Sequence, residues 1–437
     1  MSKLLAIVGR PNVGKSTLFN RLVESRKAIV DDISGVTRDR QYEYSDWSGR
    51  EFLVVDTGGY VENSDDIFEI EIRKQVEFAV EEADVILFMV DTSVGITSQD
   101  QTFAAYLRKV KKPIVIVANK TDNHARINDT YEFFSLGFKE VIPVSSINGS
   151  GTGELLDKVV ELFGDEDEVS EANNEDLMKI AVIGKPNVGK STFVNALLGA
   201  DRNIVSTIPG TTRDSIHADY NKFGKRFTLI DTAGLRKKSS VHEDIEFYSV
   251  IRAVKAIDES DVCFMLIDAQ DGIQSQDQSI MSLVERRRKG LVILLNKWDL
   301  VDKETNTAKD YETAIKKKMA PFNDVPIITI SALTKMRVMK ALDTALEVFE
   351  NRKRKISTSE LNKVMLEAIN EFHPPAVKGK FVRIKYVTQI AASFPFFAFF
   401  CNHPQYVKDA YRRYLENKLR EKFSFNGVPI RISFRKK

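Results

Sequence analysis

Two segments of the sequence carry the residue pattern that binds a chain of phosphates. Each reads G-x-x-x-x-G-K-S after a short apolar run, which predicts a loop between a strand and a helix. Main-chain N–H groups of such a loop, with the helix N-terminus, stabilise an anion. We expect Lys15 and Lys190 to reach the β- and γ-phosphates, and the hydroxyls of Ser16 and Ser191 to bind Mg²⁺. The expected phosphate loops are Gly9, Arg10, Pro11, Asn12, Val13, Gly14, Lys15, Ser16 and Thr17 in one segment, and Gly184, Lys185, Pro186, Asn187, Val188, Gly189, Lys190, Ser191 and Thr192 in the other.

A D-T-x-G segment follows each phosphate loop and supplies a second metal ligand. Its carboxylate ends a predicted strand, where it can hold Mg²⁺ through water, and its glycine leaves an N–H free to contact a γ-phosphate. Thr37 and Thr212 lie in the segment between the phosphate loop and D-T-x-G, where they can close onto the metal when that phosphate is present. With the two lysines, Thr37, Asp56, Thr212 and Asp231 are the expected catalytic residues. The segments are Asp56, Thr57, Gly58, Gly59 and Tyr60, and Asp231, Thr232, Ala233, Gly234 and Leu235.

Two N-K-x-D segments predict selection of guanine. The carboxylate of Asp122 or Asp299 can accept hydrogen bonds from N1–H and from the exocyclic amine of guanine. Adenine has no N1–H and no amine at position 2, and would leave that carboxylate unpaired. The asparagine would hold the loop, the stem of the lysine would lie over the purine, and a later loop would complete the pocket. The expected base-binding residues are Asn119, Lys120, Asp122, Ser145, Ser146 and Ile147, and Asn296, Lys297, Asp299, Ser331, Ala332 and Leu333.

These motifs belong to an internal repeat of domain size. The phosphate loops, the T-R-D segments and the D-T-x-G segments recur at an offset of 175 residues, and N-K-x-D recurs at 177. Each copy alternates β-rich runs with helical periodicity, which predicts parallel strands with helices on both faces of a six-stranded sheet. Residues 42–47 and 51–55 flank Ser48-Gly49 and predict one antiparallel edge strand. We expect nucleotide-binding domains at 1–164 and 178–349, joined by an acidic flexible linker at 165–177.

The remaining residues, 350–437, predict a small α+β domain with the order α-β-β-α-β. They contain nineteen Lys and Arg against seven Asp and Glu, a net charge of +12 in a chain whose total is +2. This charge makes the segment the candidate for contact with RNA, although it would also fit a solvated basic surface without a partner. Its only glycines, Gly379 and Gly427, do not form a G-x-x-G clamp. We therefore expect it to dock partly against the second nucleotide-binding domain.

Composition excludes several classes of protein. A length of 437 residues predicts two to three domains, and 43% hydrophobic with 29% charged residues is typical of globular proteins. The two cysteines, Cys263 and Cys401, form no C-x-x-C pair, which argues against a disulfide framework or a zinc site. The first residues leave no room for a signal peptide, and no apolar run approaches the ~20 residues of a membrane span. We expect a cytoplasmic monomer without a membrane or DNA partner.

The whole chain resembles the double-Era-like tandem GTPases of bacteria (Der, or EngA). The resemblance rests on both sets of motifs and on the C-terminal segments YRRYLENKLRE and GVPIRISFR. It implies two Ras-like P-loop GTPase domains, a KH-like C-terminal domain, and binding to the large ribosomal subunit and its rRNA in ribosome assembly. Tyr60 and Leu235 stand where many small GTPases have a water-orienting Gln. The resemblance implies assistance by K⁺, bound by Asn12 and Asn187, although these amides would serve equally to brace their loops.

We therefore predict a switch that hydrolyses GTP to GDP and phosphate at two sites with Mg²⁺ and K⁺. One rival is a ribosome-binding scaffold in which one domain only holds nucleotide, and it would show no turnover in that copy. Another is a tRNA-modifying GTPase, which would act on tRNA. No additional catalytic domain is visible in the sequence to support it.

Overall fold

The computed structural model describes most of the chain in two compact units, Met1–Asn173 and Asn174–Lys437. The described residues are 3–27, 42–57, 76–164, 177–198, 218–222, 225–230, 246–302, 307–319, 322, 324–377 and 379–436. Several expected features lie outside them: Thr37, Thr212, the D-T-x-G residues 58–60 and 231–235, and residues 165–176 of the acidic segment.

The first unit contains a six-stranded sheet in the order β2-β3-β1-β4-β5-β6. Only the edge strand β2 runs antiparallel to its neighbour, which confirms the predicted hairpin. The central strand β4 is buried along its whole length, as expected for a parallel strand covered on both faces. The strands are β1 (Lys3–Val8), β2 (Tyr42–Trp47), β3 (Arg50–Asp56), β4 (Val85–Asp91), β5 (Ile114–Asn119) and β6 (Val141–Pro143).

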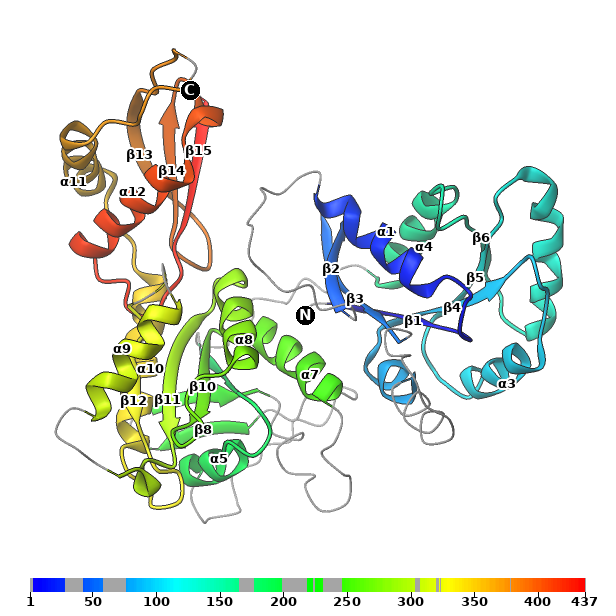
Figure 1. Cartoon of the computed structure of the whole chain (residues 1–437), viewed down its shortest axis with the longest axis horizontal. Helices are drawn as coiled ribbons and strands as arrows, with labels where there is room; N and C mark the ends of the chain where they lie inside the picture. Colours follow the sequence, from blue (N-terminus) through cyan, green and yellow to red (C-terminus); the bar gives the residue numbers. More distant parts are fainter. Residues whose placement is uncertain are drawn as a thin grey trace. The chain divides into compact units, whose positions relative to one another are not determined.

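Helices cover both faces of this sheet (Figure 1). One face packs with Leu18 and Leu22 of α1 and with Leu155 and Val159 of α4 in a single apolar cluster. On the other face, Phe88 of β4 stacks with Phe103 of α3. The described helices are α1 (Lys15–Lys27), α3 (Ser98–Leu107), η1 (His124–Leu136, a 3-10 helix) and α4 (Thr152–Leu162).

The second unit begins with a repeat of this sheet, in the order β12-β11-β10-β7-β9-β8. Its strands are β7 (Met178–Ile183), β8 (Ala218–Lys222), β9 (Lys225–Leu229), β10 (Val262–Asp268), β11 (Gly290–Asn296) and β12 (Ile327–Thr329). Its described helices are α5 (Lys190–Leu198), α7 (Glu246–Glu259), α8 (Ser275–Arg286), η2 (Trp298–Leu300), α9 (Thr307–Met319) and α10 (Val338–Lys353). One apolar cluster holds α5 and α10, and the other holds α7, α8 and α9. The predicted pair of α/β domains is confirmed.

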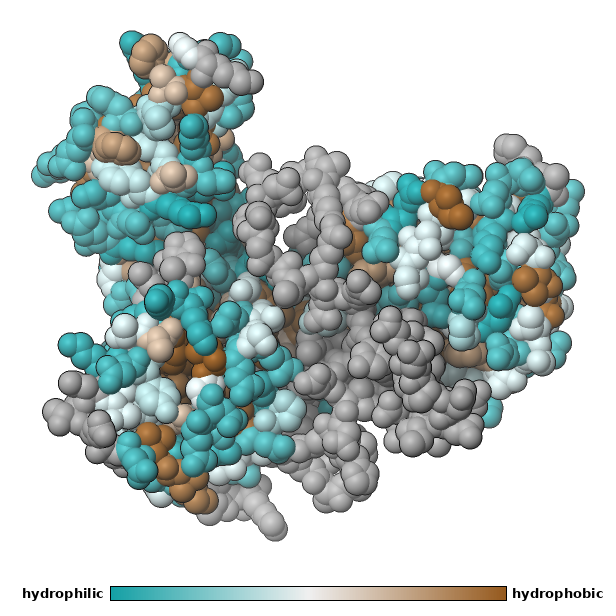
Figure 2. All heavy atoms as spheres, in the orientation of Figure 1, coloured by the Kyte–Doolittle hydropathy of each residue, from teal (hydrophilic) through white to brown (hydrophobic). Residues whose placement is uncertain are grey.

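The C-terminal residues form the predicted order α-β-β-α-β, with one added short 3-10 helix. The elements are α11 (Thr358–Glu371), β13 (Ile384–Ile390), β14 (Phe396–Cys401), η3 (Pro404–Tyr406), α12 (Asp409–Lys422) and β15 (Arg431–Lys436). α11 begins where the Ser357 side chain accepts a hydrogen bond from Glu360 N–H. α11 and α12 pack on one face of the sheet β13-β14-β15. Figure 2 shows that the described surface of this domain is mainly hydrophilic on the face in view.

The small domain docks against the second nucleotide-binding domain, as the missing G-x-x-G clamp led us to expect. Leu291 N–H, at the start of β11, donates to the Gly427 carbonyl at 2.8 Å. Val428 belongs to the apolar core of the nucleotide-binding domain. The Arg420 guanidinium lies 2.7 Å from Asp324. α10 runs unbroken across residue 350, so helix, core and ion pair all join the two domains.

Within the described residues, no helix combines the length and the apolar character needed to cross a membrane.

Candidate nucleotide-binding sites

Two glycines of each phosphate loop lie where no side chain fits. A Cβ on Gly9 would stand 2.5 Å from the Met89 carbonyl oxygen, and one on Gly14 would stand 2.4 Å from Asn119 Nδ2. Gly14 also has φ +97°, which an L side chain rarely adopts. The loop is therefore packed closely against β4 at Met89 and against the end of β5 at Asn119.

Lys15 supplies a buried positive charge at this loop. Its ammonium donates to the carbonyls of Gly9 and Arg10, both at 2.9 Å, and the residue is only 8% exposed. Burial lowers the pKa of Lys15 below its ordinary value, although the charge of Asp56 opposes that shift. A buried ammonium held by two neutral carbonyls keeps most of its attraction for a phosphate oxygen.

The expected metal ligands of the first domain lie together. Ser16 Oγ, in the first turn of α1, donates to Asp56 Oδ2 at 2.7 Å, at the end of β3. A hydroxyl and a carboxylate are the oxygen ligands that Mg²⁺ prefers, and Mg²⁺ takes its remaining ligands from water and phosphates. The described residues contain no group of three His, Cys, Asp or Glu side chains that could hold a metal unaided. The pair therefore fits a Mg²⁺ ion that arrives with a nucleotide.

One buried asparagine joins the phosphate loop to the base-binding loop. Asn119 Nδ2 donates to the Val13 carbonyl at 2.7 Å, while its Oδ1 accepts from Ser146 N–H at 3.0 Å. Asp122 is exposed and accepts from Ser145 Oγ at 2.5 Å, and Ile147 is 72% exposed. The carboxylate is thus oriented by a hydroxyl and open to a base.

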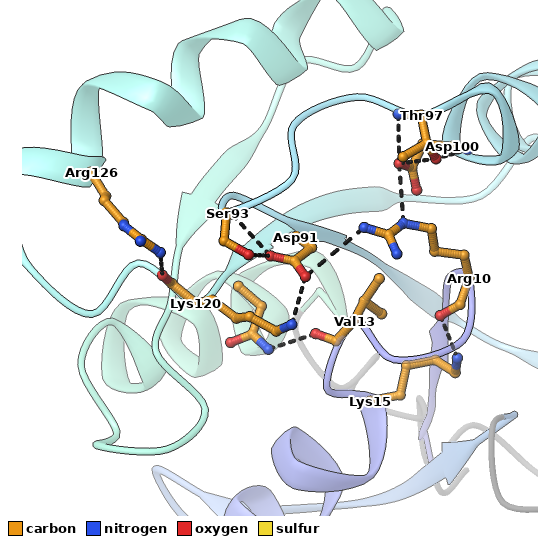
Figure 3. Close-up of polar contacts among 10 residues, drawn as sticks. Arg10, Val13, Lys15, Asp91, Ser93, Thr97, Asp100, Lys120 and Arg126 are labelled. Atoms are coloured by element: carbon orange, nitrogen blue, oxygen red, sulfur yellow. Dashed lines mark hydrogen bonds and ion pairs between the residues drawn. The ribbon is translucent and has the colours of Figure 1, made fainter.

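The lysine of this loop is held by a carboxylate that our sequence reasoning did not assign. Lys120, at φ +65°, places its ammonium 2.6 Å from Asp91 Oδ2 at the end of β4. Figure 3 shows Asp91 between Lys120 and the guanidinium of Arg10. Its second oxygen accepts from Ser93 N–H and Oγ. Burial opposes the charged form of Asp91, but hydrogen bonds from Lys120 and Ser93 hold its pKa below the ordinary value.

The second domain repeats the described part of this arrangement. Asn296 Nδ2 donates to the Val188 carbonyl at 2.8 Å and its Oδ1 accepts from Ala332 N–H at 2.9 Å. The Lys190 ammonium contacts the carbonyls of Gly184 and Lys185. A Cβ on Gly189 would stand 2.4 Å from Asn296 Nδ2, as in the first domain. Asp299 and Leu333 are exposed.

The structure also places four further residues that the sequence predicted. Asn12 and Asn187 both have left-handed main chains, at φ +64° and +62°, inside their loops. Thr57 is buried, with its hydroxyl on the Ile7 carbonyl. Ser331 is buried and bonds Thr334 N–H.

Sequence reasoning missed three kinds of contact. It assigned no role to Asp91 and Asp268, although both end a repeated apolar run, and that repetition was a usable signal. It missed Asp100, although T-x-x-D at 97–100 is a helix-start pattern. It also missed Arg21, whose guanidinium contacts the carbonyls of Ser146 and Ile147 from α1. No short motif marks Arg21, because its partner lies more than a hundred residues away.

Family models match three separate segments of the chain. The model described as "50S ribosome-binding GTPase" matches residues 4–120 and again 179–297. The model described as "KH-domain-like of EngA bacterial GTPase enzymes, C-terminal" matches residues 355–435. The fold and the paired loops therefore define a P-loop GTPase with two complete copies of its domain family.

Full-length relatives narrow this class to one family. Proteins named "GTPase Der" from Christiangramia forsetii and Flavobacterium johnsoniae are each 56% identical, over 437 and 436 residues, and the match covers 100% of this chain and of each relative. The "GTPase Der" of Bacteroides fragilis strain ATCC 25285 is 56% identical over 439 residues with the same coverage. The chain belongs to the GTPase Der (EngA) family and is a GTPase.

Proposed function

We propose that this GTPase is a two-site switch that binds the large ribosomal subunit or its precursor and acts in ribosome assembly. The observation that carries the proposal is the duplicated asparagine link. In both domains one buried amide bonds the phosphate loop and the base loop together. This shared link supports nucleotide binding by both copies, and turnover measured separately at each site would distinguish two working GTPase sites from a scaffold in which one copy only holds nucleotide.

Hydrolysis at each site would proceed by positioning and charge neutralisation. Lys15 and Lys190 lie beside the loop carbonyls, from which each ammonium can turn to the β- and γ-phosphates. Charge that develops on the transferred phosphoryl group is stabilised there without reorganising solvent. We assign Ser16 with Asp56, and Ser191 with Asp231, to Mg²⁺, which neutralises phosphate charge when bound. Thr37, Thr212, Gly59 and Gly234 are proposed to contact the metal or the γ-phosphate.

A monovalent cation is proposed to assist hydrolysis. Tyr60 and Leu235 cannot orient water as a Gln does, and Asn12 and Asn187 present amides from left-handed turns in the phosphate loops. Turnover should rise when Na⁺ is replaced by K⁺ at equal ionic strength. Asn12→Ala and Asn187→Ala should each remove that rise at its own site. A rate indifferent to the exchange would leave both amides as braces of their loops.

The partner is proposed from charge and from the family description. The segment 350–437 has a net charge of +12, and the family model that matches the two nucleotide-binding domains is described as ribosome-binding. Lys385 and Arg435 are exposed on the three-stranded sheet, where they are open to phosphate groups. Removing the entire segment would be a poor test, because Val428 is part of the neighbouring core.

Co-sedimentation with ribosomal subunits tests this proposal. We expect the full chain to sediment with the large subunit, with an affinity that differs between GDP and a non-hydrolysable GTP analogue. The double substitution Lys385→Glu with Arg435→Glu should weaken binding and flatten its salt dependence by about 0.7–0.9 in log–log slope for each phosphate that is no longer neutralised. The matched control, Lys109→Glu with Lys111→Glu, changes two exposed charges of the first domain. The proposal would be contradicted if binding to the large subunit changed neither with the nucleotide nor in the variant Lys385→Glu with Arg435→Glu.

A further inference from the structure

We infer that Arg10 and Asp100 are positioning residues that join the phosphate loop of the first domain, through Asp91, to the lysine of its base loop, and that the second domain lacks this link. The inference rests on the proposed guanine nucleotide site and adds a determinant of how that site holds the base. It is carried by a continuous line of charged contacts in the first domain (Figure 3).

Arg10 stands at the centre of that line. Its main-chain carbonyl accepts from the Lys15 ammonium at 2.9 Å. Its side chain is 13% exposed, and its guanidinium lies 3.4 Å from Asp100 Oδ2 through Nε and 3.9 Å from Asp91 Oδ2 through Nη2. A guanidinium presents several donors in a fixed plane, so one side chain can face two carboxylates at once. The same residue thus contacts the phosphate-binding lysine and both carboxylates.

Asp100 fixes where the guanidinium lies. It is fully buried in the first turn of α3, and its Oδ2 accepts from Thr97 N–H at 3.0 Å and from Thr97 Oγ1 at 2.7 Å. These bonds close the capping box that starts the helix. Because these bonds fix the carboxylate, its charge favours one position of the Arg10 guanidinium, with which it forms an ion pair at 3.4 Å.

Asp91 carries the connection to the base loop. Its Oδ2 faces both the Arg10 guanidinium and, at 2.6 Å, the Lys120 ammonium. The carboxylate attracts both cations, which repel each other, so a displacement of either changes the field that acts on the other. Lys120 lies between Asn119 and Asp122, so its position affects the residues that face the base.

The second domain breaks the line at one residue. Lys185 takes the place of Arg10, and its single ammonium contacts Gln274 Oε1 at 2.6 Å and lies 3.6 Å from Asp277. Lys297 still lies 2.6 Å from Asp268. Within the part of the chain that the structure describes, Lys185 forms no ion pair with Asp268. Lys185 therefore ties its phosphate loop to the capping box of α8, and the charged connection to the lysine of the base loop is missing, although the Asn296 link remains.

The test compares GDP with inosine diphosphate, which lacks the 2-amine. Titration calorimetry on the full chain would give both dissociation constants at the first site, in a Lys190→Ala background that weakens the second. Arg10→Lys keeps the charge but reaches one carboxylate, and should reduce the preference for GDP about three- to tenfold. Asp100→Asn should do the same, and the double variant should add little, because both break one line. In the second domain, with a Lys15→Ala background, Lys185→Arg should raise the preference for GDP.

The outcomes separate three cases. A preference unchanged in both Arg10→Lys and Asp100→Asn, with GDP and inosine diphosphate weakened equally, would show that Arg10 only supports the loop and would overturn the inference. A parent chain without any preference for GDP would instead contradict the proposed base site itself. If Arg10→Lys fails to fold, Asp100→Asn and Lys185→Arg still decide the question.

Discussion

The two nucleotide-binding domains share their sheet order and their loop geometry. They differ in the contacts made around the strand that ends at the base loop, which is β5 in the first domain and β11 in the second. In the first domain Asn119 ends β5, and the base loop is reached by the line Arg10, Asp91 and Lys120. In the second domain Asn296 ends β11, and the opposite end of that strand bonds Gly427 of the small domain through Leu291. In the first domain, charged side chains thus join the base loop to the phosphate loop. In the second domain, strand β11 joins the base loop to the KH-like domain.

This difference indicates how the two copies of a repeated domain can have different functions. β11 is one fully buried strand whose ends contact the KH-like domain and the nucleotide loop. A displacement at either end is carried by packed main chain, because a close-packed core does not absorb it. A ligand shifts such an equilibrium only by its differential affinity for two arrangements. We therefore expect nucleotide at the second site to affect the KH-like domain most directly.

The largest effect that tests this comparison is loss of a phosphate lysine. Lys15→Ala and Lys190→Ala should each reduce turnover at their own site by about 10²–10³-fold, because each removes a buried charge at the developing phosphoryl group. Phosphate release from both variants and from the double variant measures it. We expect Lys190→Ala to change binding to the large subunit more than Lys15→Ala does. Matching defects in subunit binding would reduce the repeat to simple redundancy.

The second largest effect is expected on the preference of each site for guanine. Asp122→Asn and Asp299→Asn should each shift their own site from GTP toward xanthosine triphosphate by about 10–10²-fold, since the hydrogen-bond pattern inverts. Competition binding measures the ratio of affinities.

Ser145→Ala should weaken guanine preference in the first site, because Ser145 Oγ orients Asp122 at 2.5 Å. Ser331→Ala is the matched control, since in the described residues Ser331 forms no hydrogen bond with Asp299. Equal effects of the two serine variants would contradict this distinction.

The contact between β11 and the KH-like domain can be broken at Gly427. A Cβ there would stand 2.6 Å from Val348 Cγ2 and 2.9 Å from the Leu291 carbonyl oxygen, at φ +73°. Gly427→Ala should reduce the unfolding free energy of the second unit by about 1–3 kcal/mol and leave the first unit unchanged. Calorimetry of thermal unfolding resolves the separate transitions of the two units. Gly379→Ala, at φ +72° with no neighbour within 4 Å, is the matched control for strain alone. Equal losses in both variants would show that the close contact contributes nothing.

The smallest effect is expected at the two thiols, both in the second unit. Burial raises the pKa of Cys263 to about 11, and burial also raises the pKa of Cys401. At about pH 8 neither should react with a thiol reagent until the second unit unfolds. A folded pKa above the unfolded value of 9.0 means that Cys263 contributes stability below pH 9.0, and that this contribution falls as pH rises toward about 11. Absorbance after addition of the reagent measures the reaction, with Cys263→Ala isolating Cys401. Rapid labelling of the native chain would contradict the burial of these strands.

Much of the fold could be predicted because its signals are local. The apolar runs of β4 and β10 are continuous, as strands covered on both faces must be, and Ser48-Gly49 marks the hairpin of β2 and β3. The phosphate loops are equally local, since Gly14 and Lys15 act within one turn of chain. The expected roles of Thr37, Thr212 and the residues after Asp56 remain predictions, because they lie outside the described residues.

The sequence by itself determined the duplication and the class of ligand, because each repeated motif is short and local, and it predicts that Asp122 and Asp299 read guanine. Only the tertiary structure decided which charges meet. Arg10, Asp91 and Asp100 are separated by up to ninety residues and come together at the ends of neighbouring elements. The same holds for Leu291 and Gly427, which join two domains through main-chain atoms. A main-chain contact carries no side-chain signature, and a lysine in place of an arginine looks conservative until the second carboxylate is seen beside it.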